Sequence, residues 1–570
     1  MDVMDVVDEV KFFLVKHLKL KKSELELDVP PSEEFGDFAL PCFKFVKKTG
    51  VNPVETAKLF AEKLSRLPED CIVKEVKAVG PYLNIFVNKQ YVAKQLLPLI
   101  FTNEDFGKGT GKKERVMVEF FQANTHKAVH IGHVRNMCLG IALSNVLEFL
   151  GYRVIRANYQ GDIGPHVVKC LWGIMHFNEK PPKENRLRWL GDIYARANKL
   201  ISGNEKLEAE IREMTKKLYE GDPKLVELWQ QTRQWCLEDF EKIYKDFGVK
   251  FDVLFFESEV EKIGKEIVLE LLQKGIAKKS EGAIIMDLKK YGLGVFLLLR
   301  SDGVPLYSTK DIALAKIKFE RYKIDRSIYV VGSEQELYFK QLFKTLELMG
   351  FKQARKCYHL SYGLVMLPEG RMSSREGTIV LYDDLMEKLY KKAEEEIKAR
   401  KLVPEEEIPK LKKKIAFSAL KFGMTMRENN KNIVFDWEKA LSFEGETGPY
   451  VQYAHARICS IFRKFGDKGK LPLPAEIKFE LLKTREEEKL IMELSKFPFI
   501  VADAGENYKI HLLCRYLLDL AQAFNEYYHA HRILDAELEL RNARLYLVEC
   551  VRKVLKIGLN LLGIDAVERM

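Results

Sequence analysis

The tetrapeptide His130-Ile131-Gly132-His133 constrains the fold most, because it stands between a predicted strand and a long predicted helix. The β-branched and aromatic run 116–121 predicts the strand. Apolar residues at helical spacing predict a helix over about 133–150, which ends at Gly151. The run 152–159 predicts a second strand. Strand, helix and strand within this length form a βαβ unit, which predicts a parallel sheet.

The residue types in this tetrapeptide suit a phosphate group. The first turn of a helix offers free N–H groups and partial positive charge to an anion. Gly132 lets a nucleotide approach the backbone without a Cβ in the way. His130 and His133 can donate hydrogen bonds to phosphate oxygens as charge develops on them. The alternative interpretation is two surface histidines at a helix start.

A second element, Arg371-Met372-Ser373-Ser374-Arg375, follows a predicted strand near the far end of the same domain. A basic, serine-rich loop is by itself most often a solvated turn. Together with His130-Ile131-Gly132-His133 in a parallel sheet, it resembles the paired HIGH and KMSKS motifs of class I aminoacyl-tRNA synthetases. The resemblance implies that Gly132, Arg371, Met372, Ser373, Ser374 and Arg375 bind ATP, with His130 and His133 as catalytic residues.

The flanking segments narrow the resemblance to the arginyl-tRNA synthetases. The similar stretches are VEFFQANTHKAVHIGHVRN, LEFLGYRVIRANYQGDIG, SDGVPLYSTKDIALAK, IYVVGSEQ and FEGETGPYVQYAHARICSI, with EFGDFAL near the start and LNLLGIDAVERM at the end. The family's activity would be the ATP-dependent attachment of L-arginine to tRNA(Arg) through an arginyl-adenylate. ATP is expected as substrate, with Mg²⁺ required by the chemistry, and the protein is expected to be a monomer. The scattered cysteines indicate a reducing cytoplasm and no structural zinc or other metal site.

The predicted fold class is α/β, with three parts along the chain. Residues 1–105 are expected to form an N-terminal α+β module that contacts tRNA. Residues 106–385 are expected to form a split, doubly wound, Rossmann-like catalytic domain with a helical insertion at about 183–250. After the insertion, the runs 283–288, 294–300, 327–332 and 362–367 are expected to supply further strands. Residues 386–570 are expected to form an all-α anticodon-binding domain.

Arginine requires a pocket with carboxylates, because its guanidinium is planar, always charged and rich in donors. Tyr307 and Asp311 are four residues apart and would share one helical face. The resemblance implies that these two residues and Glu257 hold the guanidinium. It also implies that Asn124 and Gln335 orient the α-amino and carboxylate ends, with Glu119 as a further member of the set. Taken singly, Asp311 and Glu257 could be surface acids, and Tyr307 could be a core tyrosine.

The chain departs from the family motif where the second lysine of KMSKS would stand, since Ser374 occupies that position and Arg371 the first. Some family members that lack this lysine carry one just before HIGH, and Lys127 precedes His130 by three residues. Lys127 is therefore a candidate catalytic residue that supplies the missing ammonium. Glu376 adds an acid near the predicted phosphate site.

The C-terminal part contains the candidate tRNA contacts. The resemblance is strong around Tyr450, Gln452, Tyr453 and Arg457. Aromatic rings and arginine suit stacking on unpaired bases. Aromatic residues in helices are, however, more often part of the core.

Composition excludes several other classes. The 570 residues are 47% hydrophobic and 31% charged, which is typical of a globular protein and not of a disordered one. No apolar run is long enough to span a membrane. The nine cysteines include no CxxC pair, which argues against a disulfide framework and against a zinc site of the usual spacing. The net charge of +10 is consistent with a polyanionic partner.

Three alternatives to an arginine-specific enzyme are open on sequence alone. A catalytically silent relative could bind RNA only, which the intact His130, His133, Tyr307 and Asp311 argue against. A small nucleotidyltransferase of the HxGH type would lack the helical tail. A synthetase for another amino acid would differ in the pocket residues.

Overall fold

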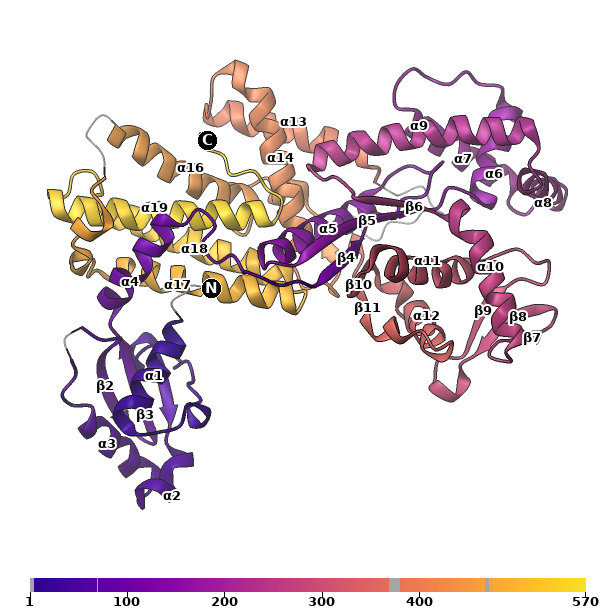
Figure 1. Cartoon of the computed structure of the whole chain (residues 1–570). Coiled ribbons are helices and arrows are strands. Elements are labelled where there is room, and N and C mark those ends of the chain that lie inside the picture. The colour runs from indigo at the N-terminus through magenta and orange to yellow at the C-terminus, as the bar shows by residue number, and fades with distance from the viewer. Residues whose placement is uncertain (1–4, 69, 367, 369–379, 467–470) are drawn as a thin grey trace.

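The computed structural model describes residues 5–68, 70–366, 368, 380–466 and 471–570. The N-terminal unit is a three-stranded antiparallel sheet of order β1-β3-β2, covered by α1 (Val6–Leu18) and α3 (Pro53–Lys63). Its strands are β1 (Phe38–Pro41), β2 (Val73–Val79) and β3 (Tyr82–Val87). Helix α4 (Lys89–Thr102) joins this unit to the rest of the molecule, where it packs against α17 (Arg485–Glu506) and α19 (Leu538–Leu561) (Figure 1).

The central sheet has five parallel strands in the order β11-β10-β4-β5-β6, which confirms the predicted parallel α/β fold. The strands are β4 (Arg115–Glu119), β5 (Arg153–Gln160), β6 (Val253–Phe256), β10 (Arg326–Gly332) and β11 (Cys357–Tyr362). Helix α5 (Ile131–Phe149) connects β4 to β5 and starts at the predicted tetrapeptide. The predicted βαβ unit is therefore present.

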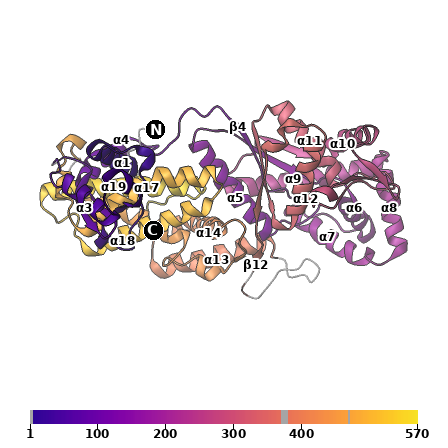
Figure 2. The ribbon, with the colours of Figure 1, turned by 90° about the horizontal axis from the view of Figure 1, so that it is seen from below.

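Alternate residues of the central strands belong to different hydrophobic cores. Val116 and Val118 of β4 are buried in the core that contains α5 and the C-terminal helices. Met117, between them, is buried in a second core with α10, α11 and α12. This is the two-residue period of a strand covered on both faces. Figure 2 shows the sheet standing between these two groups of helices.

Two of the predicted strands lie outside the central sheet. Residues 283–288 and 294–300 contain β8 (Ala283–Asp287) and β9 (Val295–Leu299), which form a separate antiparallel sheet with β7 (Lys278–Ser280). The few residues between β8 and β9 are too short for a parallel crossover, which needs a dozen or more. In the run 362–367, Tyr362 ends β11, and Val365–Met366 form β12, which pairs with β13 (Ile433–Val434) near the C-terminal helices. Leu367 lies outside the described residues.

The segment between β5 and β6 is helical from Pro165 onward, earlier than the expected insertion at about 183–250, and most of the C-terminal part is helical as well. The helices between β5 and β6 are α6 (Pro165–Phe177), α7 (Arg186–Ile201), α8 (Glu205–Tyr219) and α9 (Pro223–Phe247). The layer on the second core is α10 (Glu257–Gln273), α11 (Tyr307–Tyr322) and α12 (Glu336–Leu348). The C-terminal helices are α13 (Tyr382–Arg400), α14 (Ile408–Thr425), α16 (Gly448–Phe465), α17 (Arg485–Glu506), α18 (Ile510–Ala530) and α19 (Leu538–Leu561).

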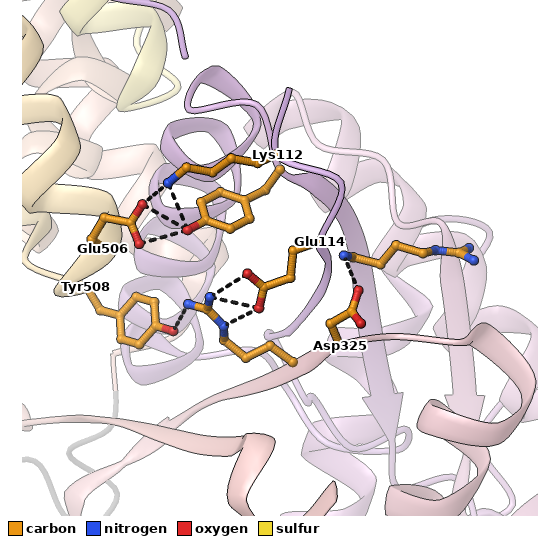
Figure 3. Close-up of polar contacts among 8 residues, drawn as sticks. Lys112, Glu114, Asp325, Glu506 and Tyr508 are labelled. Carbon is orange, nitrogen blue, oxygen red and sulfur yellow. Dashed lines mark hydrogen bonds and ion pairs between the residues drawn. The ribbon is translucent and has the colours of Figure 1, made fainter. Parts of the chain in front are cut away.

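The turn between α17 and α18 is bound to the central sheet by polar contacts (Figure 3). Arg326 of β10 donates to the Tyr508 hydroxyl at 2.7 Å and to both Glu114 carboxylate oxygens at 2.8 and 2.9 Å. Glu506 accepts from the Tyr152 hydroxyl at 2.8 Å and from Lys112. These residues come from the segment just before β4, from the central sheet and from the α17–α18 turn. Their contacts therefore fix the C-terminal helices relative to the strands. Across the described ranges, no helix is long and apolar enough to cross a membrane.

Candidate active site

The two histidines cap the N-terminus of α5 with their own side chains. The His130 Nδ1 atom accepts from the Gly132 N–H at 3.2 Å, and the His133 Nδ1 atom accepts from the His130 N–H at 3.2 Å. The ring centroids are 3.9 Å apart. A nitrogen that accepts a hydrogen bond cannot carry a proton, so in each neutral ring the proton is on Nε2. Each ring therefore presents an N–H donor to a ligand.

Both imidazoles are neutral near pH 7. Burial lowers the pKa of His130 to about 4, and the charge of Lys127 acts in the same direction. Burial, together with the neighbouring His130 and Lys127, holds the pKa of His133 well below its usual value. The pair can donate hydrogen bonds to a phosphate over a wide pH range without changing its charge.

Arg135, one turn further along α5, positions this helix. Its side chain is fully buried and donates to the carbonyl oxygens of Lys431 at 2.9 Å, Asn429 at 3.0 Å and Gly363. Burial lowers the pKa of Arg135 to about 10. One guanidinium thus ties the α5 helix to the segment before β12 and to the loop before β13.

Lys127 is half-buried in the loop between β4 and α5. Burial and the nearby Lys169 lower its pKa. Its ammonium lies 5.1 Å from the ring centroid of Tyr194, and no acidic side chain in the described ranges is within ion-pair distance. The predicted partners Arg371, Met372, Ser373, Ser374, Arg375 and Glu376 lie outside the described residues.

Carboxylates gather at the carboxyl ends of the central strands, the edge at which open α/β sheets bind ligands. Glu257 follows β6, is 4% exposed and binds the Lys310 ammonium at 2.7 Å. The same ammonium lies 3.3 Å from Glu261. Burial raises the pKa of Glu257, against the opposing charge of Lys310. Asn124 and Glu257 flank Gly161, where a Cβ would stand 2.1 Å from the Asn124 Oδ1 atom.

Asp311 is the carboxylate of this group that forms no ion pair with any described lysine or arginine. Its Oδ2 atom accepts from the Tyr338 hydroxyl. Burial raises the pKa of Asp311 to about 7 against the effect of that hydrogen bond, and the charge of Glu119 adds to the rise. Lys318, which could have neutralised it, pairs instead with Glu119 at 2.5 Å, where both side chains are buried.

The remaining predicted residues lie on the same edge or beside it. Tyr307 is the first residue of α11, one turn before Asp311, and is 55% exposed. Gln335 is exposed after β10, within the short helix Ser333–Gln335. Glu119 ends β4. The structure therefore brings the predicted arginine-pocket residues to one end of the central sheet.

Sequence reasoning missed Lys310, Lys318 and Tyr338. Lysines 310 and 318 lie on α11, the helix that carries Asp311, but lysines on a helix usually indicate a solvated face. Burial of both, at 5% and 0% exposure, became evident only from the fold. Asp162, for which the sequence suggested no role, accepts from Arg233 at 2.8 Å and from the Ser258 hydroxyl at 2.7 Å, and so holds α9 against α10.

The predicted RNA contacts on α16 divide into two groups. The Arg457 guanidinium lies between the rings of Tyr453 and Tyr528, 4.7 and 4.9 Å from their centroids. These three side chains line a cavity of about 600 Å³, here called the base pocket, together with residues of the α18 end and Met570. Gln452 is instead fully buried and donates to the Asp565 carbonyl oxygen at 2.7 Å. In this structure Gln452 therefore joins α16 to the C-terminal segment, and its side chain is not exposed to a partner.

Tyr450 is half-buried and packs against the main core. It is placed in the first turn of α16, where its N–H binds the Thr447 hydroxyl at 3.1 Å. It does not line the base pocket.

Three family models match consecutive parts of the chain. They are the arginyl tRNA synthetase N terminal domain over residues 5–87, the tRNA synthetases class I (R) catalytic domain over 95–437, and the DALR anticodon binding domain over 451–570.

Individual proteins agree with the family models. Arginine–tRNA ligase of Bdellovibrio bacteriovorus is 38% identical over 556 residues, which cover 95% of this chain and 93% of the relative. The ligase of Halothermothrix orenii is 35% identical and covers 98% of this chain and 97% of its own. The structure of Thermus thermophilus arginyl-tRNA synthetase superposes with a TM-score of 0.81 at 28% identity, over 99% of both chains. The arginyl-tRNA synthetase of Plasmodium falciparum shares the fold, with a TM-score of 0.78 at 21% identity over the full length of both. These matches confirm the resemblance found in the sequence: the chain belongs to the arginyl-tRNA synthetase family of class I.

Proposed function

We propose that this chain attaches L-arginine to tRNA(Arg) with ATP, through an arginyl-adenylate formed at the carboxyl edge of the central sheet. The observation that carries the proposal is the charge balance of the pocket, where no cation of the described ranges pairs with Asp311. The arginine–tRNA ligases that this chain resembles over nearly its whole length support the same reaction.

Among the described residues, the acids of the pocket outnumber its lysines by two, and Asp311 is the acid with no lysine within ion-pair distance. Its acids are Glu119, Glu257, Glu261 and Asp311, and its lysines are Lys310 and Lys318. Each glutamate has a lysine within ion-pair distance, whereas the partner that the described residues offer Asp311 is the Tyr338 hydroxyl. A guanidinium would supply the missing charge and a planar set of donors.

The other residues of the pocket are assigned to the rest of the arginine molecule. Tyr307 covers the guanidinium with its ring, and Asn124 and Gln335 orient the α-amino and carboxylate groups. Glu119 affects arginine binding indirectly. Its charge raises the pKa of Asp311, and its ion pair with Lys318 keeps that ammonium from pairing with Asp311. Glu257 contributes its second oxygen to the guanidinium while Lys310 holds the first.

ATP is assigned to the N-terminus of α5. His130 and His133 donate from Nε2 to phosphate oxygens, Gly132 allows close approach, and Lys127 adds an ammonium. Arg371 to Arg375 are proposed to close on the triphosphate. Mg²⁺ would arrive with ATP as part of the substrate, because this ion keeps several waters and is usually held by substrate phosphates and not by an all-protein cage.

The chemistry is displacement at phosphorus followed by acyl transfer. An arginine carboxylate oxygen forms a bond to the α-phosphorus, and the bond to the bridging oxygen breaks, so that pyrophosphate leaves with the electron pair. The terminal 2′-hydroxyl of tRNA then attacks the acyl carbon, and AMP leaves. The enzyme supplies alignment and charge stabilisation for both steps.

The C-terminal helices are proposed to hold the anticodon part of tRNA. The base pocket offers the rings of Tyr453 and Tyr528 with Arg457 between them, an arrangement suited to stacking on unpaired bases. The N-terminal unit is proposed to contact the body of the tRNA. The protein is proposed to act as a cytoplasmic monomer.

A charging assay tests the proposal directly. The purified protein is incubated with bulk tRNA, ATP, Mg²⁺ and each amino acid in turn, and with competing mixtures. Only arginine should become attached, and His130→Ala should abolish the signal while binding tRNA normally. Attachment of another amino acid, or none, would contradict the proposed function.

A further inference from the structure

A cavity of about 530 Å³ lies where α5, the end of α9, α14 and the C-terminal segment meet. The basic side chains on its walls are Lys245, Lys410, Lys413, Lys414 and Lys421, and the acids are Asp246 and Asp565. We call it the lysine pocket. Five lysines against two acids leave a net charge of +3 in one cavity.

Lys421 is the buried member of this set. It is 5% exposed, and its ammonium donates to the carbonyl oxygens of Phe247 at 2.9 Å and of Gly563. Neither acceptor carries a charge, and no described carboxylate forms an ion pair with it. An ammonium has three donors, and the third has no acceptor among the described residues. Burial lowers the pKa of Lys421 to about 8.

A buried lysine without a counterion is unusual, because buried charges in proteins are normally paired. Lys413 is paired with Asp246 at 2.7 Å, and Lys414 lies 3.6 Å from Asp565. Both acids are therefore already engaged. The positive charge that remains uncompensated points to an anion that occupies the cavity.

The exposed walls of the cavity agree with this. Lys245 and Lys410 are exposed, and neither has an ion-pair partner in the part of the chain that the structure describes. All five cations are lysines, which bind phosphate as point charges without fixed geometry. That chemistry suits a nucleic-acid backbone, which is held by charge and not read for sequence.

The C-terminal segment connects the lysine pocket to the base pocket. Gly563 and Asp565 line the first, and Met570 lines the second. Five residues span at most about 18 Å. The segment is held in place, because the Val567 carbonyl oxygen accepts from His455 at 2.8 Å. A strand with unpaired bases in the base pocket would therefore carry its next phosphates past the lysine pocket.

We infer that the lysine pocket binds backbone phosphates of the tRNA strand that continues from the bases in the base pocket. This rests on the proposed function, which supplies tRNA as the partner. Nothing in the adenylate reaction uses these lysines, so the inference concerns tRNA affinity alone.

The test measures the affinity for tRNA as a function of salt concentration in Lys410→Gln, Lys245→Gln and the double variant. These side chains are exposed and unpaired, so the fold should be preserved. Lys352→Gln, an exposed lysine beside the edge strand β11, is the matched control. Each pocket substitution should make the slope of log affinity against log salt less steep by about 0.7 to 0.9, and the double variant by about twice that. The control should match the parent, and arginine binding by calorimetry should be unchanged in all four.

Unchanged slopes in the double variant, with a parent that charges arginine, would overturn the inference and leave the proposed function intact. Inorganic tripolyphosphate serves as a second probe. If the variants lose affinity for it while their tRNA slopes match the parent, the pocket binds a free polyphosphate and the inference is wrong. If the parent charges no arginine, the proposed function fails, and the slopes still decide whether the pocket binds RNA.

Discussion

Arginine binding should depend on pH through Asp311. Burial raises the pKa of this carboxyl to about 7, so half of the free enzyme carries a neutral Asp311 at neutral pH. A rise of about three pKa units corresponds to about 4 kcal/mol of unfavourable charge burial. A bound guanidinium removes that cost by pairing with the ionised form, so arginine binds to the deprotonated enzyme and releases a proton.

The size of the effect follows from the fraction of Asp311 that is ionised. With a pKa of about 7, the apparent dissociation constant for arginine should be about tenfold higher at pH 6 than at pH 8. Near pH 7, binding should release about half a proton. His130 and His133 titrate well below this window and do not contribute.

Calorimetry in two buffers of different ionisation enthalpy measures both the affinity and the proton release. Asp311→Asn should bind arginine weakly and lose the pH dependence between 6 and 8. Tyr338→Phe should shift the profile to higher pH, because the lost hydrogen bond favoured the carboxylate. A parent enzyme whose affinity is flat over this range, or whose slope survives in Asp311→Asn, would refute the reasoning.

Three further predictions concern the same site. His130→Ala and His133→Ala should each slow arginine-dependent pyrophosphate exchange, measured with tRNA present, by about 10²–10³-fold and leave tRNA affinity nearly unchanged; normal exchange in both would remove them from the site. Lys127→Ala should slow adenylate formation by about two to three orders of magnitude, and Ser374→Lys should restore part of the loss in the double variant while changing the parent little; additive effects in stopped-flow measurements would show that the two positions act independently. Lys318→Met should leave its buried carboxylate partner unpaired and lower the free energy of unfolding by about 3–5 kcal/mol, as measured by denaturant titration; a change below about 1 kcal/mol would mean that the carboxyl is protonated in the variant.

The geometry of the helix start at His130 could be predicted from the sequence more fully than that of the carboxylate pocket. His130, Gly132 and His133 are local to one helix start, so their arrangement follows from the chain itself. The pairing of Lys318 with Glu119 joins residues about 200 positions apart. That pairing, which leaves Asp311 without a cation, could be found only once β4 and α11 had been placed together.

Placement in the fold also separates the predicted RNA-contact residues of α16. Tyr453 and Arg457 are four residues apart and share the face that lines the base pocket. Gln452 is one residue earlier, about 100° around the helix, and points into the core. Sequence similarity covers the whole stretch equally, whereas the helical period separates its two faces.

The division of the central sheet between two hydrophobic cores has a consequence for how the molecule opens. The face that carries Val116 and Val118 is buried with α5 and the C-terminal helices, and the face that carries Met117 with α10–α12. Regions that share a core tend to exchange their amide hydrogens together, as one cooperative unit. We expect the backbone amides of α5 to be protected from hydrogen exchange for as long as those of α17 and α18. The amides of α10–α12 should exchange at a different rate. Local opening of α10–α12 would then admit arginine to the carboxylate pocket while His130 and His133 of α5 keep their positions.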